Sequence, residues 1–421
     1  MRFSLSSRIA IAALTFGLAA CTPPKDGPQA AEGDACSQPG AWLDTDKRQV
    51  LNGDALIRAM AEKDVVLLGE THTNREHHRW QAYMLAALHA ARPDMAVGFE
   101  MFPRSVQEAL DDWTDGHLTR SEFLRQSRWR EVWVYPSGYY MPLFDLVRQQ
   151  RLPAVALNVE RALVSRVGRE GWSAVPESDR RGIGDPAPAS DAYKRSLAGV
   201  YTMKLTRMKG GSLHGQKAGG GEKEDTEAPD EKTILADEAF GRFVDAQLTW
   251  DRAMAEAILA ARKENPNKLV VGIVGRGHAE FGHGIPHQLR DLGVDNVAVL
   301  LPVETGDACR NMPSGIADAA FVVGPDEVSG KPAPKARLGV MIETKQARTQ
   351  VISVLDGSVA AAAGIEDGDI IKTAAGFVVT SNAGLVEIIQ RQAPGTWLPL
   401  QVLRGNETKE LVAKFPQSFG E

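Results

Sequence analysis

Short aliphatic runs recur along the first three quarters of the chain, with stretches of helical periodicity between them. Consecutive apolar positions of this kind are typical of strands buried on both faces of a sheet. The runs are Val65–Glu70, Met95–Glu100, Ala154–Asn158, Leu269–Gly275, Val297–Val303 and Ala319–Val323. Helical patterns between them include Asn74–Ala91, Pro142–Gln150 and Gly241–Glu264. Strands that alternate with helices predict an α/β domain over residues 41–323, with a mostly parallel sheet and helices on both of its faces.

Two segments interrupt this alternation. Residues 209–232 combine glycines with charged residues and contain almost no apolar ones, which predicts a mobile, disordered insertion within a lid. Residues 324–337 hold prolines together with glycine and lysine, which predicts a linker between domains. The remaining segment, 338–421, shows short strands, regular turn signals and one helix near Asn382–Arg391. A chain of 421 residues is long for a single core, so we expect a second, small, β-rich α+β domain.

The N-terminus has the features of an export signal. A positively charged start is followed by an apolar segment of signal-peptide length, too short to span a membrane. It ends in Leu18-Ala19-Ala20-Cys21, which resembles the lipobox of bacterial lipoproteins. The resemblance implies that residues 1–20 are a removed signal peptide, that Cys21 carries a lipid anchor, and that residues 21–40 are a tether. The residue after this cysteine is Thr22 and not an aspartate, which in enteric bacteria fits sorting to the outer membrane. We therefore expect a protein of the outer membrane that faces the periplasm or the surface.

Charge and cysteine content narrow the choice of partners and compartment. Charged residues make up 24% of the chain and the net charge is −6, so no basic balance indicates a nucleic-acid partner. If Cys21 is acylated, Cys36 and Cys309 remain as an even pair in an oxidising compartment. The pair predicts a disulfide that ties the start of the first domain to its end; two free thiols are the alternative.

Polar side chains end four of the aliphatic runs. They are Glu70 and His72 after the first, Glu100 at the end of the second, Asn158 at the end of the third, and His278 after the fourth. Parallel strands bring their carboxyl ends to one edge of a sheet, where ligands bind in open α/β folds. Taken singly, such residues cap helices or are satisfied polar groups, but together they predict a functional rim. The chain contains no Gly-x-Ser-x-Gly elbow, P-loop or dinucleotide fingerprint.

Several motifs around these strand ends form a set. They are Gly69-Glu70-x-His72 with His77, His78 and Gln81, Phe99-Glu100-Met101-Phe102, Ala156-Leu157-Asn158, Gln247-x-x-Trp250-Asp251-x-x-Met254-Ala255, and Gly277-His278 with Gly284-Ile285-Pro286. Together they resemble the ChaN-like haem-binding lipoprotein family over residues 40–323. The resemblance implies an α/β dimer that holds haem between its subunits, tyrosine as the iron ligand, and a role in haem and iron acquisition at the outer membrane. A more distant resemblance, to TIKI and erythromycin-esterase relatives, implies hydrolysis at the matching glutamate and histidine positions.

The segment Ser190–Lys209 is the candidate haem site. Tyr193 and Tyr201 lie on an apolar stripe at helical spacing, and Lys204 and Arg207 supply cations. An apolar stripe suits a porphyrin face, cations suit the propionates, and a phenolate oxygen suits ferric iron. Either tyrosine satisfies this pattern as the iron ligand. The alternative is a plain amphipathic helix whose tyrosines pack on the core.

We also consider one histidine that follows this segment and two tyrosines that precede it. His214, inside the predicted insertion, could reach a haem propionate from another subunit. Tyr139 and Tyr140 lie between Gly138 and Pro142, so we expect them in a turn, with a structural role.

The C-terminal segment contains two further motifs. Leu338-Gly339-Val340-Met341 comes first, and Gly357-Ser358-Val359-Ala360 leads to Ala363-Gly364-Ile365-Glu366-Asp367-Gly368-Asp369-Ile370-Ile371. They resemble a bacterial periplasmic PDZ domain, with the first motif in the position of the carboxylate-binding loop. Such domains add an extended peptide to a sheet edge, and backbone N–H groups near Gly339 and Val340 would capture its terminal carboxylate. A packing module without a peptide ligand is the alternative.

Three functions therefore compete. In the first, which we favour, a homodimeric outer-membrane lipoprotein binds ferric haem through tyrosine and engages a peptide or an envelope protein through its PDZ module. In the second, a hydrolase binds a divalent metal or performs acid–base catalysis at Glu70, His72, Glu100 and His278. In the third, the protein is a scaffold whose first domain is inert. We expect a binding protein rather than an enzyme.

Overall fold

A computed structural model describes residues 35–133, 135–210, 230–265, 267–326, 336–346 and 348–418, apart from the side chains of residues 207–210. The chain divides into two units, Met1–Pro325 and Asp326–Glu421. The predicted signal peptide, Cys21, His214 and most of the predicted tether, insertion and linker lie outside the described residues. In the described part of the chain, no helix is both long enough and apolar enough to cross a membrane.

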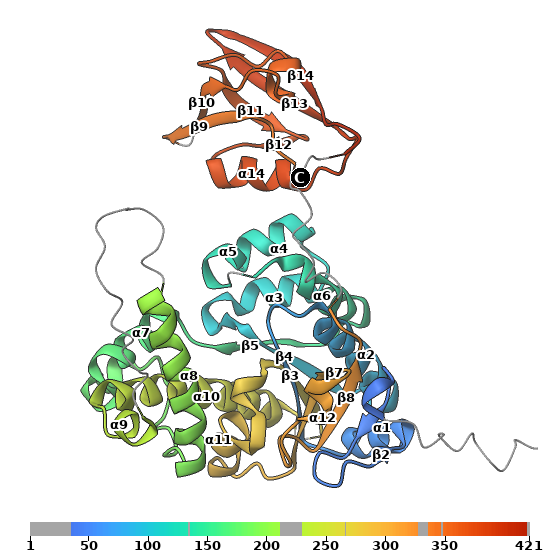
Figure 1. Cartoon of the computed structure of the whole chain (residues 1–421), viewed down its shortest axis with the longest axis vertical. Helices are drawn as coiled ribbons and strands as arrows, with labels where there is room; N and C mark the ends of the chain where they lie inside the picture. The colour runs from blue at the N-terminus through green and yellow to red at the C-terminus, as the bar shows by residue number, and fades with distance from the viewer. Residues whose placement is uncertain are drawn as a thin grey trace, which may run out of the picture. The chain divides into compact units, whose positions relative to one another are not determined.

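An eight-stranded sheet forms the centre of the first unit (Figure 1). Its strands are β1 (Trp42–Leu43), β2 (Val50–Leu51), β3 (Val65–Glu70), β4 (Met95–Pro103), β5 (Ala154–Asn158), β6 (Leu269–Gly275), β7 (Val297–Glu304) and β8 (Ala319–Val323). Their order is β2-β1-β8-β7-β3-β6-β4-β5. Neighbours from β8 to β5 pair in parallel, whereas β1 and β2 form an antiparallel edge. The sheet is therefore mostly parallel, as the alternation of strands and helices predicts.

Helices connect these strands. They are α1 (Gly53–Ala61), α2 (Arg75–Ala91), α3 (Gln107–Thr114), α4 (Arg120–Gln126), α5 (Trp129–Val132), α6 (Ser137–Gln150), α7 (Arg161–Glu170), α8 (Asp191–Gly210), α9 (Glu231–Leu235), α10 (Glu238–Glu264), α11 (Ile285–Asp291) and α12 (Asp307–Arg310). Short 3-10 turns are η1 (Ala35–Ser37), η2 (Arg104–Val106), η3 (Trp172–Ala174), η4 (Glu177–Asp179), η5 (Arg276–His278) and η6 (Glu280–Gly282).

Helices cover both faces of the sheet, and β3 shows how. Successive side chains of a strand point to opposite faces. Val66 and Leu68 pack with α2, α3 and α6 in one apolar core, whereas Val65 and Leu67 pack with α10 and α11 in another. A strand covered on both faces is apolar at consecutive positions, which is the pattern of the sequence. This confirms the predicted fold class.

One local prediction is wrong. Tyr139 and Tyr140 lie within α6 and not in a turn, although Pro142 also lies in this helix. Tyr140 and Phe144 are buried on the face of α6 that packs into the core. This burial outweighs the helix-breaking tendency of Pro142 and of the nearby glycine.

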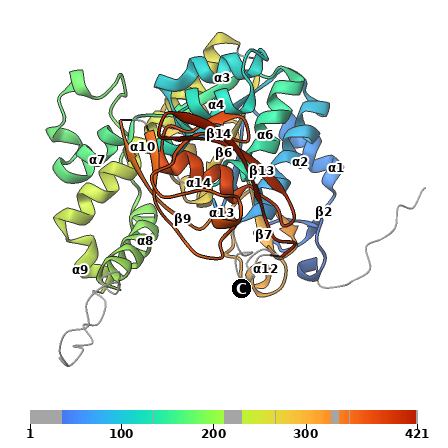
Figure 2. The same cartoon turned by 90° about the horizontal axis from the view of Figure 1, so that it is seen from above.

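The helices α7, α8 and α9 gather beside α10 at one side of the first unit (Figures 1 and 2). An apolar cluster joins α8, α9 and α10, with Tyr193 and Leu197 from α8, Ile234 from α9, and Phe240 from α10. Helix α8 coincides closely with the segment proposed for haem. Its last residues and the first residues of α9 occupy the two ends of the predicted insertion, so those ends are helical.

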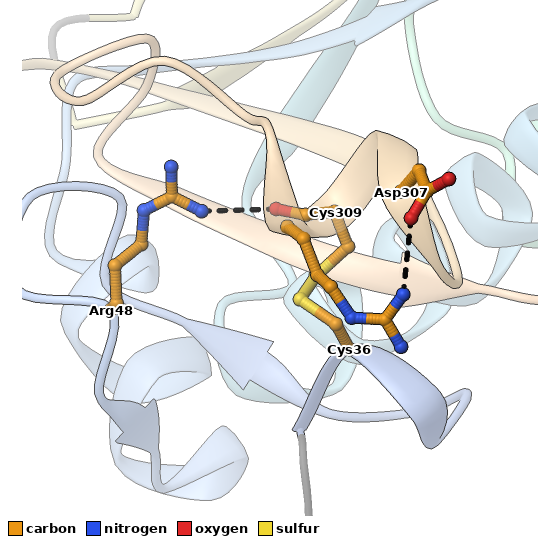
Figure 3. Close-up of a disulfide and its surroundings, with 5 residues drawn as sticks. Cys36, Arg48, Asp307 and Cys309 are labelled. Atoms are coloured by element: carbon orange, nitrogen blue, oxygen red, sulfur yellow. Dashed lines mark hydrogen bonds and ion pairs between the residues drawn. A yellow bond between two sulfur atoms is a disulfide. The ribbon is translucent and has the colours of Figure 1, made fainter.

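A disulfide joins Cys36 of η1 to Cys309 of α12, across 273 residues (Figure 3). The Cα atoms are 5.4 Å apart, and Cys309 is completely buried. Arg48 donates a hydrogen bond to the carbonyl oxygen of Cys309 at 2.9 Å. The last part of the predicted tether is therefore held against the folded unit.

The second unit is a smaller antiparallel sheet with two helices. Its order is β14-β13-β11-β10-β9, and β12 pairs with β11. The elements are β9 (Val340–Lys345), β10 (Arg348–Val354), α13 (Val359–Ala362), β11 (Ile370–Ala374), β12 (Phe377–Val378), α14 (Asn382–Gln390), β13 (Trp397–Arg404) and β14 (Glu407–Lys414). Leu338, Ile371, Leu385 and Leu400 contribute to its own apolar core. This confirms a β-rich second domain.

Candidate functional site

A cavity of about 440 Å³ lies at the carboxyl ends of β3, β4, β5 and β6. It brings together four of the five predicted rim residues, namely His72, Glu100, Asn158 and His278. Glu160 and Arg161, which come directly after the end of β5, also line it. The rest of the walls include aromatic and charged side chains that lie away from the strand ends: Trp133, Tyr135, Trp250, Arg128 and Glu131. Four residues of the predicted rim therefore line one cavity.

Glu70, the fifth rim residue, is buried and holds the ring of His72. Its Oε1 lies 2.5 Å from His72 Nδ1 and also accepts from the Tyr140 hydroxyl at 3.3 Å. Its Oε2 has no hydrogen-bond partner among the described residues. Because Nδ1 of His72 is engaged by Glu70, Nε2 is the ring nitrogen left for a ligand.

The loop after β3 is fixed by side chains at the start of α2. Nδ1 of His77 accepts from the backbone N–H of Thr71 at 3.0 Å. Nε2 of His78 lies 3.2 Å from the carbonyl oxygen of His72, and its Nδ1 lies 3.1 Å from Gln81. These motif residues therefore position the loop that carries His72 and do not line the cavity.

His72 lies among aromatic rings and carboxylates. The centroids of Trp133 and Tyr135 are 4.8 Å and 4.9 Å from that of His72. Burial lowers the pKa of His72, but the hydrogen bond with Glu70 and the charges of Glu100 and Glu70 outweigh this effect. The pKa therefore lies above its ordinary value of 6.5. The site favours a protonated His72.

Glu100 lies between the two cavity histidines. Its Oε2 accepts from the backbone N–H of Gly275, and its Oε1 lies 3.8 Å from His278 Nε2. A Cβ at Gly275 would lie 2.8 Å from Cε1 of His72, so only glycine permits this close approach. Asn158 donates to the backbone oxygen of Glu100 at 3.1 Å, which ties the end of β5 to β4.

His278 is linked to α8 through a buried carboxylate. Its Nδ1 lies 2.6 Å from Oδ1 of Asp251, and Oδ2 of Asp251 accepts from the Tyr193 hydroxyl at 2.8 Å. Burial lowers the pKa of His278, but the charges of Asp251 and Glu100 raise it to about 9. Burial and Asp251 raise the pKa of Tyr193 well above 10, so its phenol remains a hydrogen-bond donor.

The cavity therefore presents two imidazoles, each oriented by a carboxylate, with Glu100 between them. A carboxylate that holds one imidazole nitrogen fixes the ring and leaves the other nitrogen to bind or to transfer a proton. Across the described residues, no group of three or more histidine, cysteine, aspartate or glutamate side chains is placed to hold a metal ion.

The two candidate haem tyrosines lie in different surroundings, although both belong to α8. Tyr193 is 3% exposed and lines neither this cavity nor the hollow beside α9. Tyr201 is half-buried and borders that hollow, of about 640 Å³, together with Leu205 and Ile234. Its ring contacts Phe240 and Phe243, at centroid distances of 5.5 Å and 5.3 Å.

The other residues proposed for haem are only partly placed. Nζ of Lys204 lies 5.3 Å from the centroid of the Phe243 ring. Arg207 lies in α8, but its side chain is outside the described residues, as is all of His214.

The predicted carboxylate-binding loop of the second unit leads into β9. Gly339 has a φ of +82°, and a Cβ there would lie 2.2 Å from Cβ of Ser358, so this position requires glycine. The carbonyl oxygens of Leu338 and Gly339 accept from the backbone N–H groups of Ala360 and Leu355. Leu338 is buried, Val340 is half-buried and Met341 is exposed.

The sequence places Asp251 in a family motif without a role at the site, and it gives no role to Trp133 and Tyr135, which line the cavity. Asp251 carries a detectable signal, because it interrupts the apolar face of α10, and an acid on such a face needs a partner. Trp133 and Tyr135 carry none, since they follow the short helix α5, outside any strand end. Only the folded chain places them beside His72.

Residues 56–289, more than half of the chain, match the family model described as haem-binding uptake, Tiki superfamily, ChaN. Residues 336–414 match a PDZ domain. Among solved structures the chain is similar to ChaN of Campylobacter jejuni, described with cofacial haem binding, at 18% identity over 67% of this chain and 96% of that chain, with a TM-score of 0.49. It is also similar to the HtrA3 PDZ domain bound to a phage-derived ligand, at 24% identity over 19% and 84% of the two chains, with a TM-score of 0.18. No curated protein matches the chain.

Proposed function

The chain belongs to the ChaN family of haem-binding uptake proteins in the Tiki superfamily, and we propose that it is a lipid-anchored haem-binding protein of the bacterial outer membrane. The family match carries the proposal of haem binding. The lipobox-like motif that ends at Cys21 supports the anchor, and Thr22 supports outer-membrane sorting. In this role the protein serves haem and iron acquisition from the periplasmic side or the cell surface.

Tyr201 is the iron ligand that the geometry supports best. Its ring borders a hollow next to the apolar side chains of Leu205 and Ile234, and Lys232 borders the same hollow. An apolar hollow with a cation at its edge fits a porphyrin and its propionates. The Tyr193 hydroxyl, by contrast, is buried and donates to Asp251, so binding iron there would break that hydrogen bond.

A second copy of the chain would complete this site. Val200 and Met203, on α8 beside Tyr201, are 47% and 63% exposed. Large exposed apolar side chains on one helix mark a surface that another apolar surface covers. We therefore place the haem at a homodimer interface, where a bound haem supplies a ferric iron for the phenolate oxygen of Tyr201. Lys204 lies on the same helix and offers a cation for a propionate.

A hemin titration tests this assignment. We expect wild type to give a saturable absorption band and the high-spin ferric spectrum of tyrosinate ligation, and Tyr201→Phe to lose that spectrum. Tyr83→Phe is a matched control, since Tyr83 is exposed on α2. If Tyr193→Phe and not Tyr201→Phe removes the spectrum, the ligand assignment is wrong. If wild type binds hemin no better than an unrelated apolar protein does, the haem proposal fails.

Lipid attachment is tested separately. We expect Cys21→Ser to move the protein from the outer-membrane fraction to the soluble periplasmic fraction, because one thiol carries the whole anchor. If the variant stays in the membrane fraction, the lipobox interpretation is wrong.

We further propose that the PDZ domain engages the C-terminus of a peptide or of an envelope protein. The glycine at position 339 and the start of the edge strand β9 support this, because such domains capture a carboxylate there and add the peptide to the sheet. Peptides with a free carboxylate should bind, and the same peptides with an amidated C-terminus should not. Equal binding of both forms would contradict it.

Hydrolysis is a second candidate function of the first domain. The observation that favours it is the cavity in which Glu100 lies between His72 and His278. If this site hydrolyses esters, turnover of small aryl esters should fall in His72→Gln and in His278→Gln. Turnover that both variants retain would exclude this cavity as its source.

A further inference from the structure

The strand β9 is the open edge of the PDZ sheet. Among the described residues, β10 is the only strand that pairs with β9, so no described strand occupies the other side of β9. Helix α14 packs beside β9. The backbone groups of β9 that α14 leaves without a hydrogen bond therefore decide how many residues of a peptide can pair with this edge.

Asn382, the first residue of α14, is hydrogen-bonded to this strand. Its Nδ2 donates to the carbonyl oxygen of Ile342 at 3.1 Å. Its Oδ1 accepts from the hydroxyl of Thr344 at 2.6 Å, and its backbone N–H donates to the same hydroxyl at 2.9 Å. A carbonyl can only accept, so the amide nitrogen must face Ile342, and the oxygen then faces Thr344. The amide is thus held at both of its ends.

The position of the predicted carboxylate-binding loop determines which residues of a bound C-terminus lie beside which residues of β9. If the terminal carboxylate sits on the backbone N–H groups near Gly339 and Val340, the peptide runs antiparallel to β9. Its last residue then lies beside Val340. Edge-facing groups repeat every second residue of a strand, so the third residue from the end lies beside Ile342. Its N–H would seek the carbonyl oxygen of Ile342.

We propose that Asn382 is the specificity-determining residue of this domain, because it occupies the Ile342 carbonyl oxygen and limits strand addition to the last two residues of a peptide C-terminus. The proposal rests on the proposed peptide binding. A longer terminus leaves the edge at its third residue, since its N–H would have to share the Ile342 carbonyl oxygen with Nδ2 of Asn382 or displace an amide that already has two partners. Recognition then depends on the carboxylate and the last side chain, for which the half-buried Val340, Ile342 and Ile388 would supply apolar surface. The occupant is a free C-terminus with an apolar last residue.

Backbone N-methylation tests the register one hydrogen bond at a time. The probes are fluorescein-labelled hexapeptides with free carboxylates ending in Val, Leu or Phe, each also made with a methyl on the third nitrogen from the end. Binding to the purified full-length protein is followed by fluorescence anisotropy. A third peptide series carries the methyl on the last nitrogen and reports the hydrogen bond beside Val340, which every variant should keep.

We expect methylation at the third nitrogen to change the wild-type Kd less than about twofold. In Asn382→Ala the same methyl should weaken binding by about two- to tenfold, the range of one backbone hydrogen bond. Asn382→Asp should behave likewise, since a carboxylate cannot donate to Ile342 yet still accepts from Thr344. Asn406→Ala, in the exposed turn between β13 and β14, should match wild type.

The outcomes separate the two proposals. If no free-carboxylate peptide binds any variant, peptide binding itself is wrong, and the role of Asn382 is lost with it. If peptides bind and the third-nitrogen methyl weakens wild type as much as it weakens Asn382→Ala, peptide binding stands and the assignment of Asn382 is overturned.

Discussion

The protonation of His278 should make the stability of the first unit depend on pH. The pKa of His278 is about 9 in the folded protein against an ordinary value of 6.5. A group whose pKa rises on folding stabilises the protein below its unfolded pKa, and this contribution disappears as the pH rises through the folded pKa. A difference of about 2.5 in pKa corresponds to roughly 3 kcal/mol. The free energy of unfolding should therefore fall by about that amount between pH 6.5 and pH 9.

Asp251→Asn isolates this effect. The substitution removes the charge that does most to raise the pKa of His278, yet its amide oxygen still accepts from Tyr193. We expect the fall in stability between pH 6.5 and pH 9 to shrink to less than about half in the variant. His72, whose pKa is also raised, contributes a fall of the same sign in both proteins.

Urea unfolding followed by tryptophan fluorescence measures the effect. Only Trp397 of the eight tryptophans lies in the second unit, so the signal reports chiefly on the first. Midpoints and slopes at pH 6.5, 7.5, 8.5 and 9.5 give the free energy of unfolding at each pH. Wild-type and Asp251→Asn proteins with the same dependence on pH would refute the coupling between Asp251 and His278.

Three further substitutions or treatments test the packing of the first unit, each by urea unfolding at neutral pH. Tyr193→Phe leaves Oδ2 of Asp251 buried without its donor and should cost about 1–3 kcal/mol; a loss under about 0.5 kcal/mol would contradict that hydrogen bond. Gly275→Ala drives a Cβ against His72 and should cost about 1–3 kcal/mol, and unchanged stability would show that the ring moves freely. Reduction of the disulfide should cost about 2–5 kcal/mol, whereas an identical midpoint with and without reductant would mean that the crosslink is absent.

Much of the fold was predictable because its signals are local. Four predicted strands agree with β3, β5, β6 and β8 at both ends, since burial on two faces requires consecutive apolar residues. The boundaries of β4 and β7 extend further, to Pro103 and Glu304, because pairing with a neighbouring strand decides where a strand ends. The same reasoning predicted the meeting of Glu100 and His278, which lie at the carboxyl ends of neighbouring strands.

The partners of the site residues were not predictable in this way. Asp251 lies 27 residues from His278 and 58 from Tyr193, and Glu100 lies 175 residues from Gly275. Periodicity indicates that a side chain is buried, but it does not indicate against what. That depends on which helix packs on which strand.

The sequence by itself determined the alternation of strands and helices, the strand ends that carry polar residues, and the motifs of two families, because each is a property of neighbouring residues. Tertiary structure alone gave chemically identical groups different surroundings. Tyr193 and Tyr201 share a helix and an apolar stripe, yet the first is enclosed and donates to Asp251, while the second borders an open hollow. The physical reason is that α8 is covered unevenly by its neighbours, and burial of a phenol depends on contacts between elements distant in the chain.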